Sequence, residues 1–170
     1  MIKCPNCGGE VGEEYNFCKY CGAKLSEAEI RSKIELSPEA EIRNILTKRF
    51  DGIKNRDEAA IKSVIGEHYN KFDDWEPLKL QEAEEALKNE FGAFKVLLNY
   101  VYELTDTNIN IFGDFAVATF YIHYEGEIRN RHFKITSRVS SILRKQNNSW
   151  KIIHEHLSRF PEETRRRFWQ

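Results

Sequence analysis

Four cysteines near the N-terminus constrain this chain of 170 residues more than any other feature. Cys4-Pro-Asn-Cys7 and Cys18-Lys-Tyr-Cys21 are two CxxC pairs with ten residues between them, and the chain has no other cysteine. Each pair can form a tight turn that aims two thiolates at one point, and two such turns make the tetrahedral sulfur cage that zinc prefers. Gly8-Gly9 and Gly22 follow the pairs, where such turns need residues that tolerate positive φ. The sequence therefore predicts a zinc ribbon over residues 1–25, with Cys4, Cys7, Cys18 and Cys21 as ligands of one structural zinc per chain.

Two disulfides, or a redox CxxC motif, are the competing interpretations of these cysteines. A redox motif would normally lie at a helix start in a βαβ unit, and no such pattern surrounds the pairs. Iron in the same cage is a further alternative. Four thiolates leave no open coordination position, so the metal is expected to be structural and not catalytic. The segment holds too little apolar surface to fold alone, and metal binding would therefore supply its folding free energy.

The charge balance and composition exclude several classes of protein. The chain is 41% hydrophobic and 31% charged, which is typical of a soluble globular protein and not of a disordered one. A net charge of −1 argues against a protein that holds nucleic acid mainly through phosphate contacts. The basic cluster Arg165-Arg166-Arg167 is more simply explained as part of a solvated tail over residues 162–170. Without a visible targeting signal or membrane-spanning stretch, and with thiols that must stay reduced, we expect a cytoplasmic protein with no membrane partner.

The rest of the chain predicts an α+β domain. A linker helix is expected over residues 26–36, and Ser37 before Pro38 is a favourable start for the first helix of the domain, which extends to Lys54. A second helix is expected over residues 57–68, followed by a polar, aromatic loop over 69–77 and a third helix over 80–94. After these come segments of high β-propensity at 95–104, 108–112, 115–125, 131–145 and 150–159. The sequence thus predicts three N-terminal helices packed on one face of a curved, mainly antiparallel sheet, with bulges in the long strands.

Several short motifs give this second part of the chain a family resemblance. Its last strand reads Trp150-Lys-Ile-Ile-His154-Glu-His156-Leu-Ser158. Asn55-Arg-Asp57 lies between the first two helices, Gly113-Asp-Phe-Ala116 opens a strand, and Arg138-Val-Ser precedes the turn at Asn147-Asn148. With these motifs, residues 37–161 resemble the SnoaL-like group of the nuclear transport factor 2-like superfamily. The similarity is greatest to the branch that contains the calcium/calmodulin-dependent kinase II association (hub) domain.

This resemblance implies a cone-shaped fold with a pocket between the sheet and the helices. It also implies a homodimer formed through the sheet, with larger oligomers possible by likeness to the hub domain. It does not imply one activity, because members of the superfamily include isomerases, cyclases, dehydratases, assembly hubs and plain ligand binders.

Alternation along the strands identifies a candidate pocket. In residues 115–125 the more apolar face is expected to face the helices, because burying it is the main reason for the domain to fold. The pocket residues predicted on this basis, with two from the preceding loop region, are Tyr69, Trp75, Phe120, Ile122, Tyr124, Val139 and Leu157. Glu155 is then the one carboxylate among apolar side chains, and such surroundings disfavour the charged form of a carboxylate. Glu155 is therefore the candidate catalytic acid or base, with the alternative that it pairs with a basic side chain at the pocket mouth.

The two histidines of the last strand are expected on the outer face of the sheet, in an interface role. Strand parity places His154 and His156 there with Arg138, together with Trp150 and Ile152. A two-residue turn at Asn147-Asn148 would put Arg138 on the opposite face from His156, so a three-residue loop with a bulge is the favoured interpretation.

Two further groups of side chains have open interpretations. The acidic residues Asp73, Asp74 and Glu76 around Trp75 are interpreted as a solvated loop, with a pocket lid as the alternative. The aromatic residues Tyr15, Phe17 and Tyr20 are interpreted as the core of the ribbon, with a docking surface for a protein partner as the alternative.

Three functions remain open at this point. The favoured hypothesis is a non-catalytic module that binds a small ligand or mediates assembly, with the ribbon docking a protein partner. The alternative is an isomerase, cyclase or lyase for small molecules that uses Glu155 for proton transfer. The third is a nucleic-acid-associated protein. Charge balance counts against the third, and the few polar groups expected inside the pocket count against the second.

Overall fold

A computed structural model describes residues 2–4, 6–12, 17–24 and 37–160, and the chain divides into two units, Met1–Pro38 and Glu39–Gln170. The predicted linker helix over 26–36 and the predicted basic tail over 162–170 lie outside the described residues. Among the helices that are described, none combines the length and the apolar character needed to cross a membrane.

The first unit is built from two turns with the same backbone pattern. Strands β1 (Ile2–Lys3) and β2 (Glu10–Val11) pair antiparallel on either side of the first turn. In each turn, the first cysteine accepts a hydrogen bond from the glycine four residues later and donates one to the carbonyl five residues later. The bonds are Gly8 N to Cys4 O, Cys4 N to Gly9 O, Gly22 N to Cys18 O and Cys18 N to Ala23 O, at 2.8–2.9 Å. Gly8 and Gly22 adopt φ values of 72° and 71°, a region that strains any residue with a Cβ.

The small core of this unit consists of cysteines and one valine. Cys4, Val11 and Cys18 are buried together, with Ala23 packed against them. Phe17 and Tyr20 are 57% and 63% exposed, so the interpretation of these two aromatic residues as the ribbon core is wrong. Tyr15 lies outside the described residues.

The second unit begins with the predicted helix α2 (Pro38–Asn55), followed by the shorter α3 (Glu58–Val64). Asp57 caps α3, since its Oδ1 accepts a hydrogen bond from the amide of Ala60 at 2.9 Å. The second predicted helix is wrong beyond Val64, because strand β3 (Ile65–Phe72) takes its last four residues and the start of the predicted loop.

Long-range pairing explains this difference. Strand β3 pairs parallel with β8 (Ser149–Arg159), and β4 (Leu80–Glu82) pairs antiparallel with β3. The third predicted helix is therefore shortened to α4 (Ala83–Ala93). The exposed hydrogen-bonding groups along the edge of β8 are satisfied by β3, and this gain outweighs a local helical pattern that sequence periodicity alone would favour.

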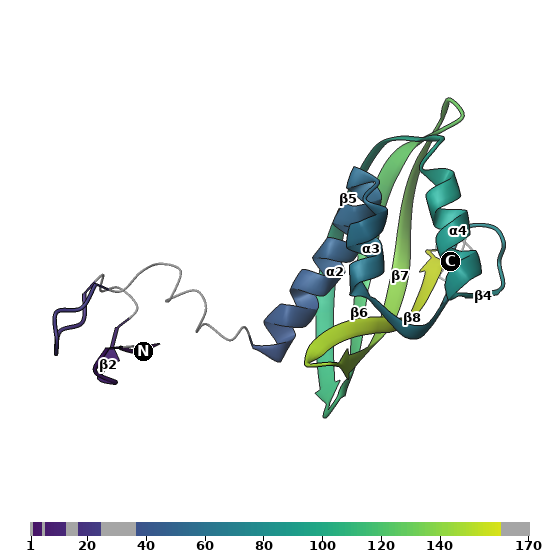
Figure 1. Cartoon of the computed structure of the whole chain (residues 1–170). Helices are drawn as coiled ribbons and strands as arrows, with labels where there is room; N and C mark the ends of the chain where they lie inside the picture. Colours follow the sequence, from purple (N-terminus) through teal and green to yellow (C-terminus); the bar gives the residue numbers. More distant parts are fainter. Residues whose placement is uncertain (1, 5, 13–16, 25–36, 161–170) are drawn as a thin grey trace, which may run out of the picture. The chain divides into compact units, whose positions relative to one another are not determined.

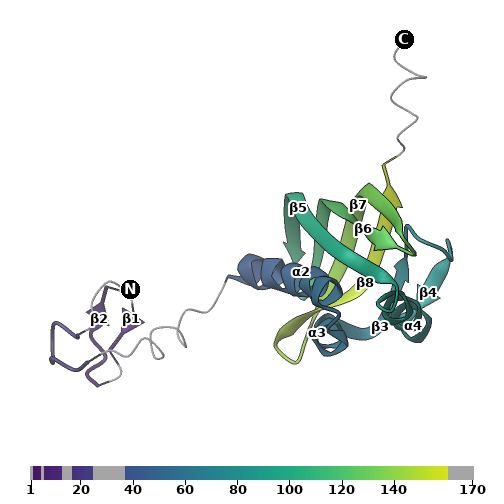
Figure 2. The same ribbon diagram turned by 90° about the horizontal axis from the view of Figure 1, so that it is seen from above.

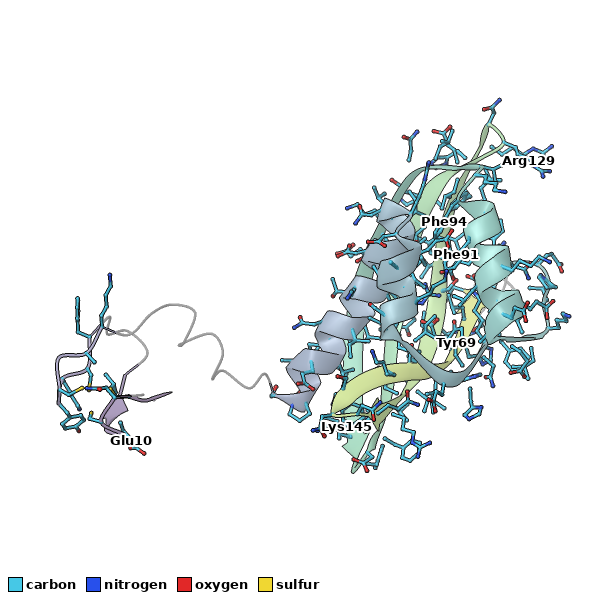
Figure 3. All side chains as sticks on the ribbon, in the orientation of Figure 1. Glu10, Tyr69, Phe91, Phe94, Arg129 and Lys145 are labelled. Carbon is cyan, nitrogen blue, oxygen red and sulfur yellow. The ribbon has the colours of Figure 1, made fainter. Side chains whose placement is uncertain are left out.

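The sheet has six strands in the order β4-β3-β8-β7-β6-β5, with β5 (Leu97–Phe112), β6 (Phe115–Ile128) and β7 (Arg131–Gln146) forming long antiparallel hairpins. Two register shifts interrupt β5, where the sequence predicted two separate strands. All three helices lie on one side of the curved sheet (Figures 1 and 2). Arg129, in the turn after β6, and Lys145, near the end of β7, mark opposite ends of the sheet (Figure 3). This architecture confirms the predicted α+β fold.

The core lies between the helices and the inner face of the sheet. The inward residues of β6 are all buried, as the alternation predicted: Ala116, Ala118, Phe120, Ile122 and Tyr124. They form one cluster with Ile42, Leu46 and Phe50 of α2. Burial of this continuous apolar surface is the main stabilising contribution to the second unit.

A bulge in β8 corrects the predicted faces of the last strand. Asn147 and Asn148 form a two-residue turn with φ values of 49° and 60°, since Gln146 pairs with Ser149, so the predicted three-residue loop is wrong. Trp150 and Ile152 are buried in the core, not on the outer face. A register shift at Ile153 then exchanges the faces.

Beyond this bulge the predicted outer face is recovered. Arg138 lies opposite Ser158, and Ser140 lies opposite His156, so these residues share one face. Arg138 and His156 therefore share one face of the sheet, as expected. The reason is the bulge at Ile153 within β8, and not a longer loop at Asn147-Asn148.

Candidate ligand-binding pocket and four-cysteine site

A cavity of about 250 Å³ lies between the helices and the inner face of the sheet. Helices α2 and α4, strands β3, β5, β6, β7 and β8, and the loop after β3 all contribute to its lining. Its aromatic lining consists of Phe50, Trp75, Phe94, Tyr100, Tyr124 and Phe133. Its charged lining consists of Arg49, Lys71, Asp73, Asp74, Glu76, Glu90 and Glu155. The cavity is thus apolar on one side and rich in charge on the other.

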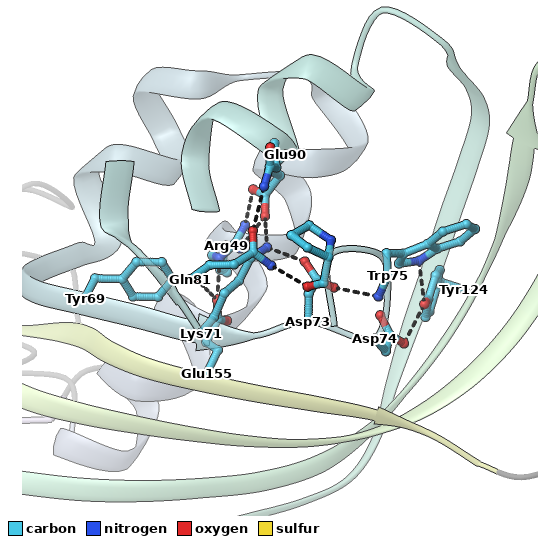
Figure 4. A network of polar contacts seen from close by, with 12 residues as sticks. Arg49, Tyr69, Lys71, Asp73, Asp74, Trp75, Gln81, Glu90, Tyr124 and Glu155 are labelled. Atoms are coloured by element: carbon cyan, nitrogen blue, oxygen red, sulfur yellow. Dashed lines mark hydrogen bonds and ion pairs between the residues drawn. The ribbon is translucent and has the colours of Figure 1, made fainter. Parts of the chain in front are cut away.

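Arg49 of α2 is the centre of the charged side. The side chain is only 2% exposed, and its guanidinium holds Glu90 of α4 with two hydrogen bonds of 2.7 Å each (Figure 4). Its Nε donates a third bond to Oε2 of Glu155 at 3.1 Å. A guanidinium presents its donors in a rigid fork, so one side chain can hold carboxylates from a helix and from a strand.

Lys71 of β3 extends this network towards the loop. Its Nζ lies 3.0 Å from Oε2 of Glu90 and 2.6 Å from Oδ2 of Asp73. Burial alone would raise the pKa of Glu90, but the charges of Arg49 and Lys71 outweigh it and lower this pKa to about 2. Burial would also lower the pKa of Lys71, yet the charges of Glu90 and Asp73 raise it overall. The ion pairs therefore keep these buried groups charged.

Glu155 of β8 is 1% exposed and lines the cavity. Its Oε2 accepts hydrogen bonds from Arg49 and from the hydroxyl of Tyr69, the latter at 2.6 Å. Its Oε1 is buried and has no hydrogen-bond partner among the described residues. The surroundings of Glu155 are thus not purely apolar as expected, because the side chain has a basic partner, while its catalytic role stays a prediction. That partner is a buried helical arginine, not a side chain at the pocket mouth.

A second carboxyl group, Asp74, lies at the aromatic end of the cavity. Its Oδ2 accepts a hydrogen bond from the hydroxyl of Tyr124 at 2.7 Å and a very short one from Ser137. The indole of Trp75 donates to Tyr124 at 3.0 Å (Figure 4). Burial raises the pKa of Asp74, although the bonds from Ser137 and Tyr124 act in the opposite direction. Asp74 is 7% exposed, so the interpretation of the whole acidic loop as solvated is wrong.

The structure places the predicted pocket residues in two groups. Trp75, Ile122, Tyr124 and Leu157 line the cavity, as does Glu155. Tyr69, Phe120 and Val139 are buried in the domain but do not line this cavity. Tyr69 contacts the pocket indirectly, because its hydroxyl donates a hydrogen bond to the cavity-lining Glu155. The expectation of few polar groups inside the pocket is wrong, since α2, α4 and β3 all contribute charged side chains.

Sequence reasoning missed Arg49, Lys71 and Glu90. A signal for Arg49 was present, because it falls seven residues after Ile42 and three after Leu46, on the apolar stripe of its helix. Glu90 likewise lies four residues after the buried Ala86. A charged residue on a buried stripe indicates a buried ion pair. Lys71 gave no such signal, because its segment was predicted to be a loop.

The four cysteines form a separate candidate site in the first unit. Their sulfur atoms all lie within 4.8 Å of one another, with Cys4–Cys21 and Cys7–Cys18 distances of 3.6 Å. These distances exceed the roughly 2.05 Å of a disulfide bond. They are close to the roughly 3.8 Å edge of a tetrahedron with Zn–S bonds of about 2.3 Å. The donor set and its geometry thus fit a tetrahedral metal ion.

Solved structures of low sequence identity share the fold of the second unit. The CaMKII hub of S. rosetta is 15% identical, with a TM-score of 0.65 over 75% of this chain and 100% of that chain. A nuclear transport factor 2-like superfamily protein from Salmonella enterica serovar Typhimurium is 22% identical, with a TM-score of 0.64 over 70% and 88%. A hexachlorocyclohexane dehydrochlorinase, LinA type 2, is 13% identical, with a TM-score of 0.64 over 71% and 84%. At such identities the likeness concerns the fold alone.

Family models agree with this result. No curated protein matches this chain. A family model described as a domain of unknown function (DUF7575) matches residues 1–26. The model of the SnoaL-like domain matches residues 42–163, which is well over half of the chain. The chain therefore belongs to the SnoaL-like domain family.

Proposed function

We propose that this protein binds a small molecule in the cavity of its SnoaL-like domain and carries a structural zinc in its N-terminal ribbon. The observation that carries the ligand proposal is a cavity of about 250 Å³ lined by Glu155, whose buried Oε1 has no hydrogen-bond partner among the described residues. A buried acceptor without a partner destabilises a protein by about 1–3 kcal/mol. A ligand that donates a hydrogen bond to this oxygen would remove that penalty.

The remaining polar groups of the pocket support binding more than catalysis. Arg49 and Lys71 each hold two carboxylates, so the charge of both cations is already paired within the protein. Groups fixed in this way make a rigid, pre-organised floor, which reduces the entropy lost when a ligand binds.

Native mass spectrometry of the purified protein tests this proposal. The expected spectrum has an added small-molecule mass that disappears under denaturing conditions. Ala93 lines the cavity, so Ala93→Trp should fill it and abolish the added mass, while Ala59→Trp on the exposed surface of α3 should retain it. An empty wild-type cavity that also fails to take up any member of a metabolite library would contradict the proposal.

The second candidate function is proton transfer to or from a bound small molecule, and Asp74 is the observation that favours it. A buried carboxyl group with a raised pKa, held by a tyrosine and a serine, has the properties of a general acid or base. In this version of the enzyme hypothesis, Asp74 takes the role that the sequence assigned to Glu155.

Hydrogen–deuterium exchange into a panel of small ketones in D₂O, followed by NMR, tests this second function. Exchange that depends on the protein should be lost in Asp74→Asn. If exchange persists in Asp74→Asn but is lost in Glu155→Gln, the original assignment to Glu155 is the better one. If the ketones exchange no faster with wild type or with either variant than in buffer, the proton-transfer function is rejected and the binding function stands alone.

The zinc proposal rests on the four sulfur atoms alone. The ion would be held by Cys4, Cys7, Cys18 and Cys21 and would supply the folding free energy of the first unit. Native mass spectrometry should show one zinc per chain, and elemental analysis separates zinc from iron.

We also propose that two copies of the chain associate through the outer face of the sheet. This face presents Tyr121, Arg138 and His156 away from the helices, with Phe160 packed on Tyr121 and Arg138 at centroid distances of 6.2 Å and 5.6 Å. Such aromatic and arginine side chains are enriched in interfaces. Light scattering should give the mass of a dimer, and Arg138→Glu should give a monomer; a monomeric wild type would reject this contact.

A further inference from the structure

The charges that line the cavity are strongly unequal. Two cationic side chains, Arg49 and Lys71, face five carboxyl groups contributed by the loop after β3, by α4 and by β8. Both cations are already held by carboxylates through bonds of 2.6–3.1 Å. Neither Arg49 nor Lys71 is therefore free for an anionic ligand, and the excess of negative charge would repel such a ligand. A cleft lined by one sign of charge raises the local concentration of ligands of the opposite sign.

The free oxygen of Glu155 gives this charge a specific point of contact. Arg49 and Tyr69 both bind Oε2, so Oε1 is the oxygen of this cavity-lining residue that has no hydrogen-bond partner among the described residues. A carboxylate oxygen accepts hydrogen bonds and donates none. The strongest partner for it in a buried site is a charged donor, because charge-assisted hydrogen bonds are roughly twice as strong as neutral ones.

The opposite side of the cavity suits the rest of such a ligand. Trp75 and Phe133 make an edge-to-face contact at 5.3 Å, and Phe133 makes another with Tyr124 at 5.9 Å. These rings form a continuous aromatic wall. The wall already receives one cation, since the guanidinium of Arg159 lies 4.5 Å from the ring centroid of Trp75. Aromatic rings accept both an apolar body and a positive charge.

From this cavity we propose that its ligand is an organic cation, a protonated amine on an apolar or aromatic body, with the ammonium group on Glu155 Oε1. This inference rests on the proposed function of the cavity and names the chemical class that the cavity takes. The ammonium group donates to the free oxygen, and the apolar body lies against the aromatic wall.

Three probes with one shared ring test the ligand class: benzylamine, benzyl alcohol and benzoate. Their affinities for the full-length protein at pH 7 are measured by titration in ¹H–¹⁵N NMR spectra. Benzylamine should bind about tenfold or more tightly than benzyl alcohol, as expected for a charge-assisted contact of 1.5–3 kcal/mol, and benzoate should bind most weakly.

A matched pair of variants assigns the contact. Glu155→Gln keeps the shape of the side chain and leaves the two bonds between Arg49 and Glu90 in place, but it removes the charge. It should reduce benzylamine affinity by about tenfold or more and change benzyl alcohol affinity by less than about threefold. Glu58→Gln makes the same chemical change on the exposed surface of α3 and should change neither.

The outcomes separate this inference from the proposal on which it rests. If benzyl alcohol or benzoate binds as tightly as benzylamine, the cavity binds small molecules but the cation class is wrong. If benzylamine binds best but Glu155→Gln retains its full affinity, the assigned contact is wrong. If none of the three probes binds at millimolar concentration, the inference fails, while a co-purified molecule in the native mass spectrum would still support a ligand pocket of another class.

Discussion

The four-cysteine unit and the SnoaL-like domain have cores of opposite kinds. Among its described residues, the four-cysteine unit has a core of Cys4, Val11 and Cys18 with Ala23 packed against them, and the sulfur atoms of its four cysteines converge on one point. The domain buries a large apolar cluster from α2 and the long strands. Beside this core the domain also buries four charged side chains, those of Arg49, Lys71, Asp74 and Glu155. The difference shows that charge in the interior is tolerated where apolar burial is already large.

The largest effect is expected in the ribbon. Cys18→Ser removes one of the four proposed zinc ligands and should lower zinc content from the expected one per chain to near zero. The unit should then unfold, because structural zinc contributes on the order of 10 kcal/mol to such folds. NMR signals of residues 2–24 should collapse, while the thermal transition of the domain should stay unchanged. Lys19→Ala in the same turn is the control and should keep both. A ribbon that stays folded without metal would break the comparison.

The next largest effect is expected at the centre of the charged network. Arg49→Met leaves Glu155 buried without a cation and Glu90 with Lys71 as its one cation among the described residues, and it should destabilise the domain by about 3–5 kcal/mol, or roughly 10 °C or more in Tm. Urea and thermal unfolding measure this loss. The triple variant Arg49→Met, Glu90→Gln, Glu155→Gln should recover part of it, since no unpaired charge then remains. An unchanged Tm for Arg49→Met would show that the network adds nothing to the stability of the domain.

Acid should weaken the domain through Glu90. The pKa of Glu90 in the folded domain, about 2, lies below its ordinary value of 4.5. A depressed pKa contributes stability that is complete above about pH 4.5 and is lost as the pH falls towards 2. The contribution is on the order of 3 kcal/mol at neutral pH. Urea unfolding between pH 6 and 3 should therefore show a steeper loss for wild type than for Glu90→Gln; equal slopes would contradict the buried pairing.

The smallest effect is expected for an exposed pair on the same domain. Lys62 and Glu58 of α3 are 3.2 Å apart, with both side chains more than half exposed. Lys62→Ala should change the free energy of unfolding by less than about 0.5 kcal/mol, because solvent and salt screen such a pair. A loss as large as that of Arg49→Met would mean that burial does not distinguish the two ion pairs.

Much of this molecule could be predicted from local sequence patterns. The spacing of the cysteines places both pairs in identical turns, because a CxxC turn is closed by bonds between residues four and five apart. The apolar stripe of α2 and the alternation of β6 correctly predicted which faces are buried. These features depend on neighbours within one turn of helix or one strand, so the local order of residues contains the necessary information.

Only the tertiary structure decided the rest. Strand β3 forms where a helical pattern continues, because the edge of β8 offers it hydrogen bonds. The bulge at Ile153 exchanges the faces of β8 and brings Trp150 into the core. The charged floor of the cavity joins Arg49 to Glu155 across 106 residues. No local pattern reports such pairings, since their free energy depends on groups that meet only when the helices close over the sheet.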